Sequence, residues 1–145
     1  MIVQPFAPGR AVSVAFLTGP AGRVALPAAQ QVLSDDGRFH YQGGRLPLPR
    51  DLNERAQRLA GRAVAAVEGL CGYVGVDLVL GAAADGSGDR VIEINPRLTT
   101  SYVGLRALAR FNLAEALLAA ASGAALPPLR WRPGPVLFQA DGRVT

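Results

Sequence analysis

The sequence contains no lysine and has one cysteine, one histidine and one tryptophan among its 145 residues. The single cysteine, Cys71, excludes an internal disulfide and a cysteine-rich metal site, and its apolar surroundings predict a buried thiol. The lone His40 cannot form a histidine cluster, so we expect it on the surface or in a strand pair. All fifteen basic residues are therefore arginine.

Long apolar runs are also absent. The most apolar stretch, 116–126, is shorter than the roughly 18 residues of a membrane span. Residues 1–10 lack the basic start and apolar core of a secretory signal, so we expect a cytoplasmic protein without a membrane partner. Charged residues make up only 18% of the chain, which excludes a highly charged disordered protein. The net charge of +4 comes from scattered arginines and therefore does not indicate nucleic-acid binding.

Half of the residues are hydrophobic, which is enough apolar sequence at this length for one domain with a core. Alternating apolar residues predict strands, and apolar residues spaced by three or four predict helices. The predicted strands are 11–17, 23–26, 31–34, 38–41, 73–80 and 90–95, followed by a hairpin of 136–139 and 143–145. Helices are predicted at 51–70 and from the N-cap Asn112 to 122, with a loop at 43–49. This order predicts an α+β domain with a mostly antiparallel sheet and helices packed on one face.

The most informative feature is an acid on each arm of the predicted hairpin 73–95. Asp77 interrupts the apolar strand YVGVDLVL, and Glu93 and Asn95 are two residues apart, so both project from the same face of their strand. If Asp77 lies opposite them, three oxygen ligands converge, as Mg²⁺ prefers. Arg97 would add a fixed positive charge for a phosphoryl oxygen or an oxyanion.

The same residues have a plainer interpretation. Asp77 could lie at a strand bulge, Glu93 could face solvent, and Asn-Pro is a common turn pair. The position of Asp77 within an apolar strand favours the metal site, because a buried carboxylate needs a cation, a donor or a proton.

The segments GYVGVDLVL and VIEINPRLTTSYVGL closely resemble the C-terminal half of the ATP-grasp domain, in the group of ATP-dependent carboxylate–amine ligases. The opening segment IVQPFAPGRAVSVAFL resembles the hinge strand of that fold, so the resemblance extends from Ile2 to about Ala121. The variant NPRLTTSYVGLR is similar to ligases that join tyramine and glutamate. The resemblance implies that a carboxylate attacks ATP to form an acyl phosphate and ADP, and that an amine then displaces the phosphate.

The resemblance also implies roles for individual residues. Asp77, Glu93 and Asn95 would hold one or two Mg²⁺ ions, or Mn²⁺, at the ATP phosphates, and Arg97 would stabilise the acyl phosphate or the tetrahedral intermediate. The backbone of four residues would receive the adenine edge: Gln4, Pro5, Phe6 and Ala7. Four further residues would line the acceptor side, unless they form a loop that caps a helix: Thr99, Thr100, Ser101 and Tyr102.

The sequence departs from the family pattern in one respect. An ATP-grasp enzyme clamps ATP between two lobes, and the N-terminal lobe supplies a glycine-rich loop and lysines, whereas this chain starts at the hinge and has no lysine. We therefore expect one lobe, 1–125, with a tail or hairpin of the same domain at 126–145, acting on small carboxylate and amine substrates as part of a larger ligase. One alternative is an inactive half-domain used for binding or for self-association, in which the surface of the missing lobe would form the contact or a homo-oligomer. The other alternative is a fragment of a biotin carboxylase-like enzyme.

Overall fold

The computed structural model describes residues 5–145, so Gln4 lies outside the described residues. In this part of the chain, seven strands form one sheet with the order β6-β5-β1-β3-β4-β7, and β2 pairs with β1. The strands are β1 (Arg10–Gly19), β2 (Gly22–Ala25), β3 (Ala29–Leu33), β4 (Tyr41–Leu46), β5 (Gly72–Leu80), β6 (Arg90–Asn95) and β7 (Val136–Gln139). Every strand pairing is antiparallel, as the sequence predicted.

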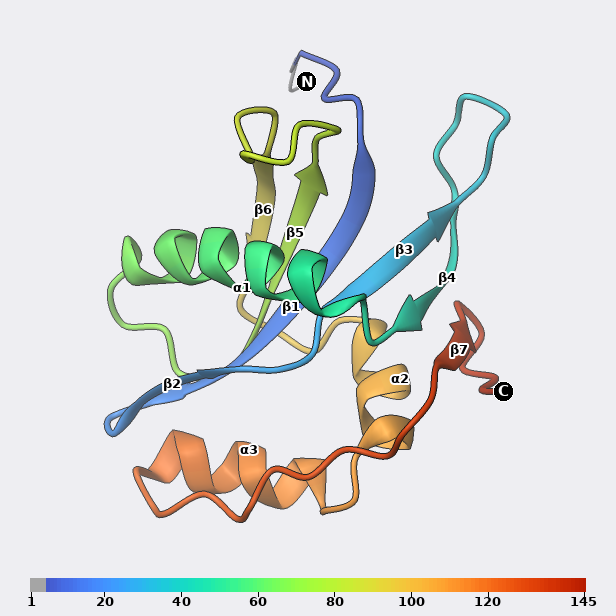
Figure 1. Ribbon diagram of the computed structural model, residues 1–145. Helices are drawn as coiled ribbons and strands as arrows, with labels where there is room; N and C mark the ends of the chain where they lie inside the picture. Colours follow the sequence, from blue (N-terminus) through green and yellow to red (C-terminus); the bar gives the residue numbers. More distant parts are fainter. Residues whose placement is uncertain (1–4) are drawn as a thin grey trace.

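The alternation along β1 produces two hydrophobic cores. Val12, Val14 and Phe16 point to one face of the sheet, where they pack with α1 (Arg50–Ala65). Ala15 and Leu17 point to the other face, which is covered by α2 (Ser101–Leu108) and α3 (Leu113–Ser122). The expectation that the helices share one face is therefore wrong, since α1 lies on the opposite side of the sheet from α2 and α3 (Figure 1). Both sides of β1 and β5 carry apolar side chains that must be covered.

Several local predictions are confirmed. Strand β6 has the predicted bounds, and β5 starts one residue earlier than predicted. The side chain of Asn112 caps α3 by accepting hydrogen bonds from the backbone N–H groups of Ala114 and Glu115, at 3.1 and 3.2 Å. Gly123 ends this helix in the left-handed conformation with φ 75°. The C-terminal hairpin also forms, with Phe138 bridged to Val144.

Four local predictions are wrong. The predicted strand 38–41 does not form, because residues 38–40 still belong to the connection and β4 starts only at Tyr41. Residues 43–46 belong to strand β4 and not to a loop, because Gly43 and Gly44 pair closely with β7. Helix α1 ends at Ala65 and not at the predicted residue 70. Residues 66–69 already turn back toward the sheet. Cys71 is exposed, since it lies in the connection that precedes β5.

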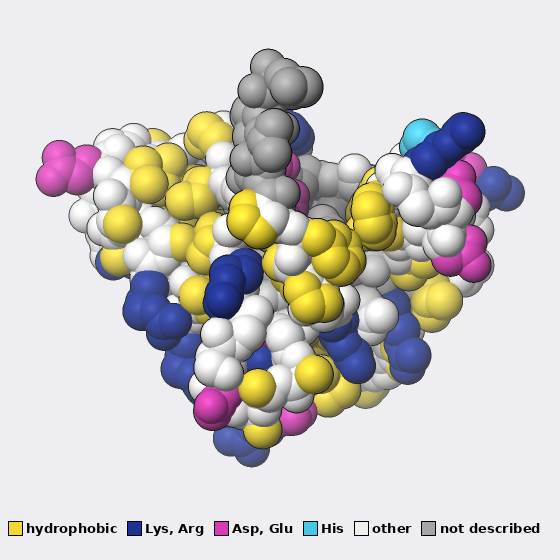
Figure 2. Space-filling view, turned by 90° about the horizontal axis from the view of Figure 1, so that it is seen from above, with side chains coloured by type: hydrophobic (Ala, Val, Ile, Leu, Met, Phe, Trp, Pro, Cys, Tyr) yellow, Lys and Arg dark blue, Asp and Glu magenta, His cyan; other side chains and the backbone are white. Residues whose placement is uncertain are grey.

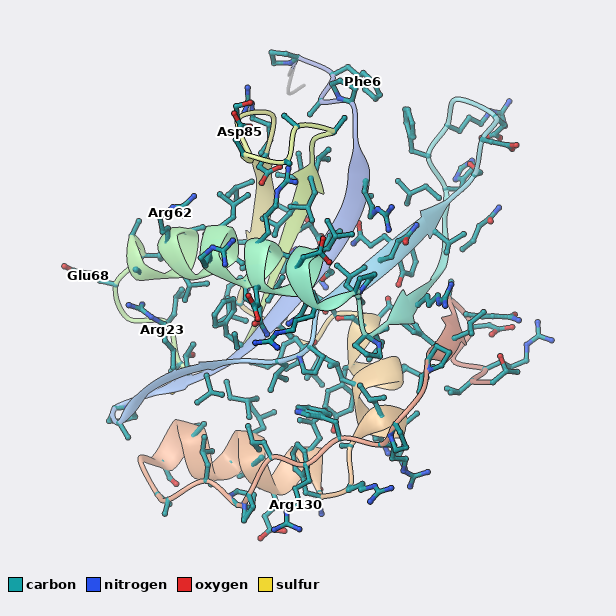
Figure 3. All side chains as sticks on the ribbon, in the orientation of Figure 1. Phe6, Arg23, Arg62, Glu68, Asp85 and Arg130 are labelled. Carbon is teal, nitrogen blue, oxygen red and sulfur yellow. The ribbon has the colours of Figure 1, made fainter. Side chains whose placement is uncertain are left out.

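The charged residues are dispersed over the surface. Figure 3 shows Arg23, Arg62 and Arg130 on different parts of the fold, each pointing away from the body of the molecule. His40 is exposed, as expected. Within residues 5–145, no helix has the length and apolar character needed to cross a membrane.

Candidate functional site

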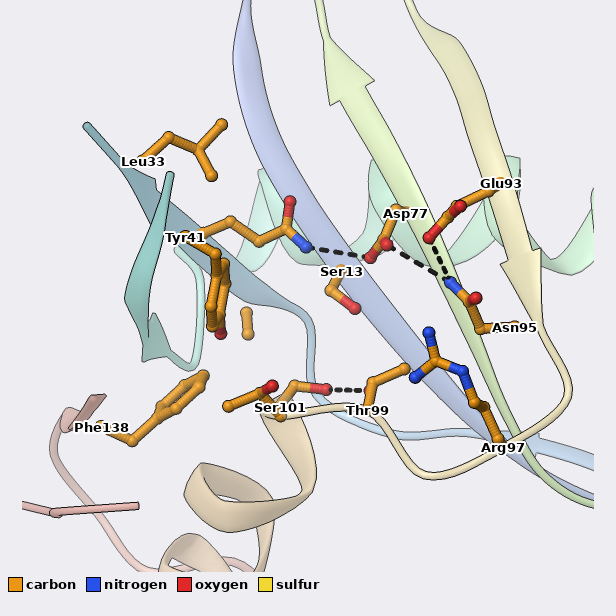
Figure 4. Close-up of a pocket in the computed structure, with 13 residues that line it drawn as sticks. Ser13, Leu33, Tyr41, Asp77, Glu93, Asn95, Arg97, Thr99, Ser101 and Phe138 are labelled. Carbon is orange, nitrogen blue, oxygen red and sulfur yellow. Dashed lines mark hydrogen bonds between the residues drawn. The ribbon is translucent and has the colours of Figure 1, made fainter. Parts of the chain in front are cut away.

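Asp77, Glu93 and Asn95 converge on one face of the sheet. Asp77 on β5 is the direct partner of Glu93 on β6, and the register shifts just after Asp77. The side-chain amide of Asn95 donates to Glu93 Oε1 at 2.7 Å and, more weakly, to Asp77 Oδ2 at 3.4 Å (Figure 4). The cross-strand convergence and the bulge both occur, so the two interpretations of this hairpin are compatible.

Two residues from neighbouring strands complete the surroundings of Asp77. Gln31 on β3 donates from Nε2 to Asp77 Oδ1 at 2.9 Å. Ser13 on β1 is the cross-strand partner of Asp77, and its buried hydroxyl has no hydrogen-bond partner within the described residues. Burial raises the pKa of the Asp77 carboxyl above its usual range, and the adjacent Glu93 acts in the same direction. Within residues 5–145, no basic side chain forms an ion pair with Asp77.

Arg97 follows β6 and reaches toward the same pocket. It is exposed, and its Nη1 donates to the backbone carbonyl of Leu98 at 3.3 Å. No carboxylate of the described chain forms an ion pair with it. Its guanidinium points toward the space between Asn95 and Thr99, so it remains available to bind an anion (Figure 4).

Three hydroxyl groups form a triangle beside these residues. Thr99 Oγ1 and Ser101 Oγ lie 2.8 Å apart, and the hydroxyl of Tyr73 is 3.2 Å from each. Thr100 also lines the pocket, and Ser101 is the first residue of α2, which forms without a side-chain cap. Tyr102 does not line the pocket and packs edge-on against Tyr73, with ring centres 6.0 Å apart.

The pocket that these groups share has a volume of about 380 Å³. Its remaining wall consists of Leu33, Tyr41 and Phe138, opposite the charged groups (Figure 4). Burial, with a smaller contribution from Asp77, raises the pKa of Tyr41 to about 12. The pocket therefore combines an anion-binding arginine, two carboxylates, hydroxyl groups and an aromatic wall.

The hinge residues lie apart from this pocket. Pro5, Phe6 and Ala7 line a second hollow of about 610 Å³, together with Val91 and Ile92 of β6. Phe6 is 74% exposed and stacks on Phe39 with ring centres 6.0 Å apart. Figure 2 shows hydrophobic side chains around this end of the molecule. The adenine-binding role of 4–7 remains a prediction.

Several pocket residues were not predicted from the sequence. They come from strands distant from the acidic hairpin in sequence, and only the strand register brings them together: Ser13, Gln31, Tyr41 and Phe138. A usable signal was the pair Gln30-Gln31 within an otherwise apolar segment, since a polar side chain in a strand interior suggests a partner. Phe138 had no such signal.

The donor set is suited to a hard cation. Two carboxylates point to the same region, and Asn95 turns its amide nitrogen toward both of them. A half-turn of this amide would place its oxygen beside the carboxylates as a third oxygen ligand. Among residues 5–145, no group of three or more His, Cys, Asp or Glu is placed for a metal ion. The two carboxylates and Asn95 are too few to fill the coordination shell of a metal ion. They would leave positions for phosphate and water, as is typical of Mg²⁺ sites.

Comparison with known proteins identifies the family. Residues 1–101 match the family model of the ATP-grasp domain. The chain belongs to the ATP-grasp family. Over 117 residues it is 32% identical to tyramine–L-glutamate ligase from Methanocaldococcus jannaschii, a match that covers 81% of this chain and 35% of the relative. The chain thus spans about a third of the length of the curated ATP-grasp ligases that it matches.

Solved structures show the same ATP-grasp fold. N5-carboxyaminoimidazole synthase from Aspergillus clavatus, in complex with ADP and 5-aminoimidazole ribonucleotide, superposes with a TM-score of 0.74 at 24% identity, over 90% of this chain and 34% of that one. Pyruvate carboxylase from Rhizobium etli superposes with a TM-score of 0.70 at 19% identity, over 88% of this chain and 14% of that one. These likenesses confirm the predicted ATP-grasp fold.

Proposed function

We propose that this chain is the metal- and phosphate-binding lobe of an ATP-dependent, ADP-forming ligase that joins a small carboxylate to an amine. The observation that carries the proposal is the convergence of Asp77, Glu93 and Asn95 in one pocket with Arg97, which forms no ion pair within residues 5–145. The identity of 32% with tyramine–L-glutamate ligase supports the carboxylate–amine class. The solved complexes of structural neighbours with ADP or ATP support a nucleotide.

Asp77, Glu93 and Asn95 would hold Mg²⁺, with Mn²⁺ as a substitute. The ion would supply positive charge that neutralises the transferring phosphoryl group. The chain's own residues prepare the site for this charge. Gln31 fixes one oxygen of Asp77, and the Asn95 amide orients the Glu93 carboxylate. The hydroxyl of Ser13 is a further donor for Asp77 or for bound water.

The reaction that we propose has two steps. A carboxylate oxygen of the first substrate attacks the γ-phosphorus of ATP, the bond to the bridging oxygen breaks, and ADP leaves. The amine nitrogen of the second substrate then attacks the acyl carbon, loses a proton and expels inorganic phosphate. Arg97 would bind the acyl-phosphate oxygens and the oxyanion of the second step, because its guanidinium offers paired donors. The nucleotide base would lie in the hollow formed by Phe6, Ala7 and Ile92.

Two other functions compete with this proposal. A carboxylase would use the same fold, and pyruvate carboxylase is among the structural neighbours, but at 19% identity that likeness shows the fold alone. A non-catalytic lobe that associates with another chain would use the exposed apolar side chains near the hinge, which include Phe6, Val91 and Ile92. The residue set at Asp77 and Arg97 favours a catalytic lobe over a non-catalytic one. The 32% identity with tyramine–L-glutamate ligase favours a ligase over a carboxylase.

The test is Glu93→Gln in the full-length protein that carries this lobe. ADP formation with carboxylate, amine and Mg²⁺ should fall at least about 100-fold, because the change removes a metal-ligand charge and keeps the side-chain shape. The matched control is Glu68→Gln, an exposed glutamate that points away from the body of the molecule (Figure 3). Retained turnover in Glu93→Gln, or an equal loss in Glu68→Gln, would contradict the proposal.

A further inference from the structure

A further pocket lies on the other side of the sheet from Asp77, the side that α1 covers (Figure 1). It has a volume of about 350 Å³, and Arg10, Gln30 and Arg45 line it, so we call it the arginine pocket. Gln30 and Gln31 are consecutive residues of β3, so their side chains project from opposite faces of the sheet. Gln31 lines the pocket that contains Asp77, and Gln30 lines the arginine pocket. An occupant of one pocket therefore leaves the other open.

The strand register gathers the polar residues of the arginine pocket into one row. Val12 on β1 pairs with Gln30 on β3, and Gln30 pairs with Arg45 on β4. Cross-strand partners project from the same face, and Arg10 is two residues from Val12, so Arg10 belongs to the same row. Arg10 Nη1 donates to Gln30 Oε1 at 3.2 Å. This bond leaves the Gln30 amide nitrogen as a further donor, since it has no acceptor within residues 5–145.

No acidic side chain balances the two arginines. None lines the arginine pocket, and within residues 5–145 neither Arg10 nor Arg45 forms an ion pair with a carboxylate. Two guanidinium groups that line one hollow repel each other. An anion bound between them would offset this repulsion and would accept charge-assisted hydrogen bonds from both.

The rest of the lining is largely apolar and rigid. It consists of Pro47, Leu48 and Pro49 before α1, and of Gly134 and Pro135 before β7. Proline fixes its own φ angle, so the three prolines hold these walls in one shape. Leu48 belongs to the core beneath α1, which anchors the first wall. The pocket therefore offers positive charge on one side and apolar surface on the other.

A phosphate monoester fits this arrangement better than a carboxylate does. Near neutral pH its phosphate group carries about two negative charges and has three acceptor oxygens, for which the row supplies two guanidinium groups and one amide. A carboxylate carries one charge, and a single arginine satisfies both of its oxygens. The organic part of the ester would contact the proline rings. The pocket volume lies within the range of small-molecule sites, about 300–1,000 Å³.

We propose that the arginine pocket binds the phosphate group of a small phosphate monoester, with Arg10, Gln30 and Arg45 as the donors. This inference goes beyond the proposed ligase function and does not depend on it, because no residue of the pocket at Asp77 takes part.

The experiment is a calorimetric titration of the full-length protein with phenyl phosphate. We expect saturable binding that Arg10→Gln and Arg45→Gln each weaken at least about tenfold, because each change removes charge-assisted hydrogen bonds. The matched control is Arg62→Gln, which removes the same charge from an exposed residue of α1 outside the arginine pocket and should bind as wild type. Circular dichroism checks that all three variants fold.

Two further measurements decide where the ligand binds and which anion is preferred. In Arg97→Gln, which removes the arginine of the pocket at Asp77, the binding that depends on Arg10 and Arg45 should persist. Succinate, a dicarboxylate, should bind at least about tenfold more weakly than phenyl phosphate. Loss of binding in Arg97→Gln alone, or an equal loss in Arg62→Gln, would overturn the inference. Absence of saturable binding to the wild type, or equal affinity for succinate, would also overturn it.

Discussion

Asp77 is a half-buried carboxylate that lies opposite Glu93 on the next strand. Its hydrogen-bond donors, Gln31 and Asn95, are neutral amides. Two carboxylates held close together without a cation repel each other, and burial adds to the cost of keeping Asp77 ionised. In the metal-free lobe this residue therefore reduces the stability of the fold, as functional residues often do.

Asp77→Asn should stabilise the metal-free protein. The substitution keeps an oxygen for Gln31 and removes a charge, so we expect the free energy of unfolding to rise by about 1 kcal/mol. Mg²⁺ should raise the melting temperature of the wild type and leave that of Asp77→Asn unchanged, as thermal unfolding with and without MgCl₂ would show. Asp35→Asn, at an exposed turn residue, is the control and should behave as wild type. A less stable Asp77→Asn would contradict this account.

The site could be predicted from sequence only where its residues share one hairpin. Asp77, Glu93 and Asn95 follow from strand periodicity and a single antiparallel pairing, which the structure has. Gln31 and Ser13 depend on the register of β3 and β1, which periodicity does not determine. Cys71 was predicted to be buried because its neighbours are apolar, yet it lies exposed in the connection before β5.

Helix α1 is fastened to the β5–β6 turn by one ion pair. Arg55 donates from Nε to Asp89 Oδ2 at 2.7 Å and from Nη2 to the backbone carbonyl of Gly81 at 2.9 Å. The backbone N–H of Gly81 in turn donates to Asp89 Oδ1 at 2.9 Å. The two side chains are only 13% and 8% exposed, so removal of either partner leaves a nearly buried charge.

Asp89→Asn should destabilise the protein by about 3 kcal/mol at neutral pH. The hydrogen bond from Arg55 lowers the pKa of Asp89 in the folded protein. The stabilisation is therefore complete above the pKa of the unfolded state, about 4, and is lost as the pH falls through the lower pKa of the folded state. The difference between wild type and variant should therefore shrink in acid, as urea unfolding at pH 7 and pH 3 would measure. Asp85→Asn in the same turn keeps its bond from the Ser87 N–H and should cost little. A pH-independent difference would contradict the ion-pair explanation.

Among the elements, those with a clear period were predictable, and those defined by close packing were not. Strands β5 and β6 and helix α3 follow from alternation and capping. The Gly43-Gly44 pair resembles a turn in sequence, yet it allows β7 to approach β4. Helix α2 was absent from the predicted order of elements because Gly104 weakens its helical pattern, whereas in the fold this glycine makes room for Phe138 and Leu46.

At the scale of the whole molecule, the C-terminal segment closes the sheet and the second core. Strand β7 is the edge partner of β4, and Trp131 forms a bridge with Ala109 while its ring contacts Phe111 at 5.1 Å between centres. Leu126, Leu129 and Val136 pack on the same core. The family match ends at residue 101, so these contacts supply structure that the matched segment lacks.

Removal of residues 126–145 should therefore lower the free energy of unfolding by more than the replacement of one core side chain by alanine does. Loss of Phe138 alone resembles a Phe→Ala change of about 3–5 kcal/mol, and the loss of Trp131 adds to it. Because small domains have about 5–15 kcal/mol in total, the truncated protein should unfold at low urea and bind a hydrophobic dye. Urea unfolding followed by far-ultraviolet circular dichroism measures this, with Leu137→Ala as the control that removes an exposed side chain from β7. A truncated protein that unfolds at the wild-type urea concentration would contradict this expectation, because it would show that residues 1–125 fold without β7.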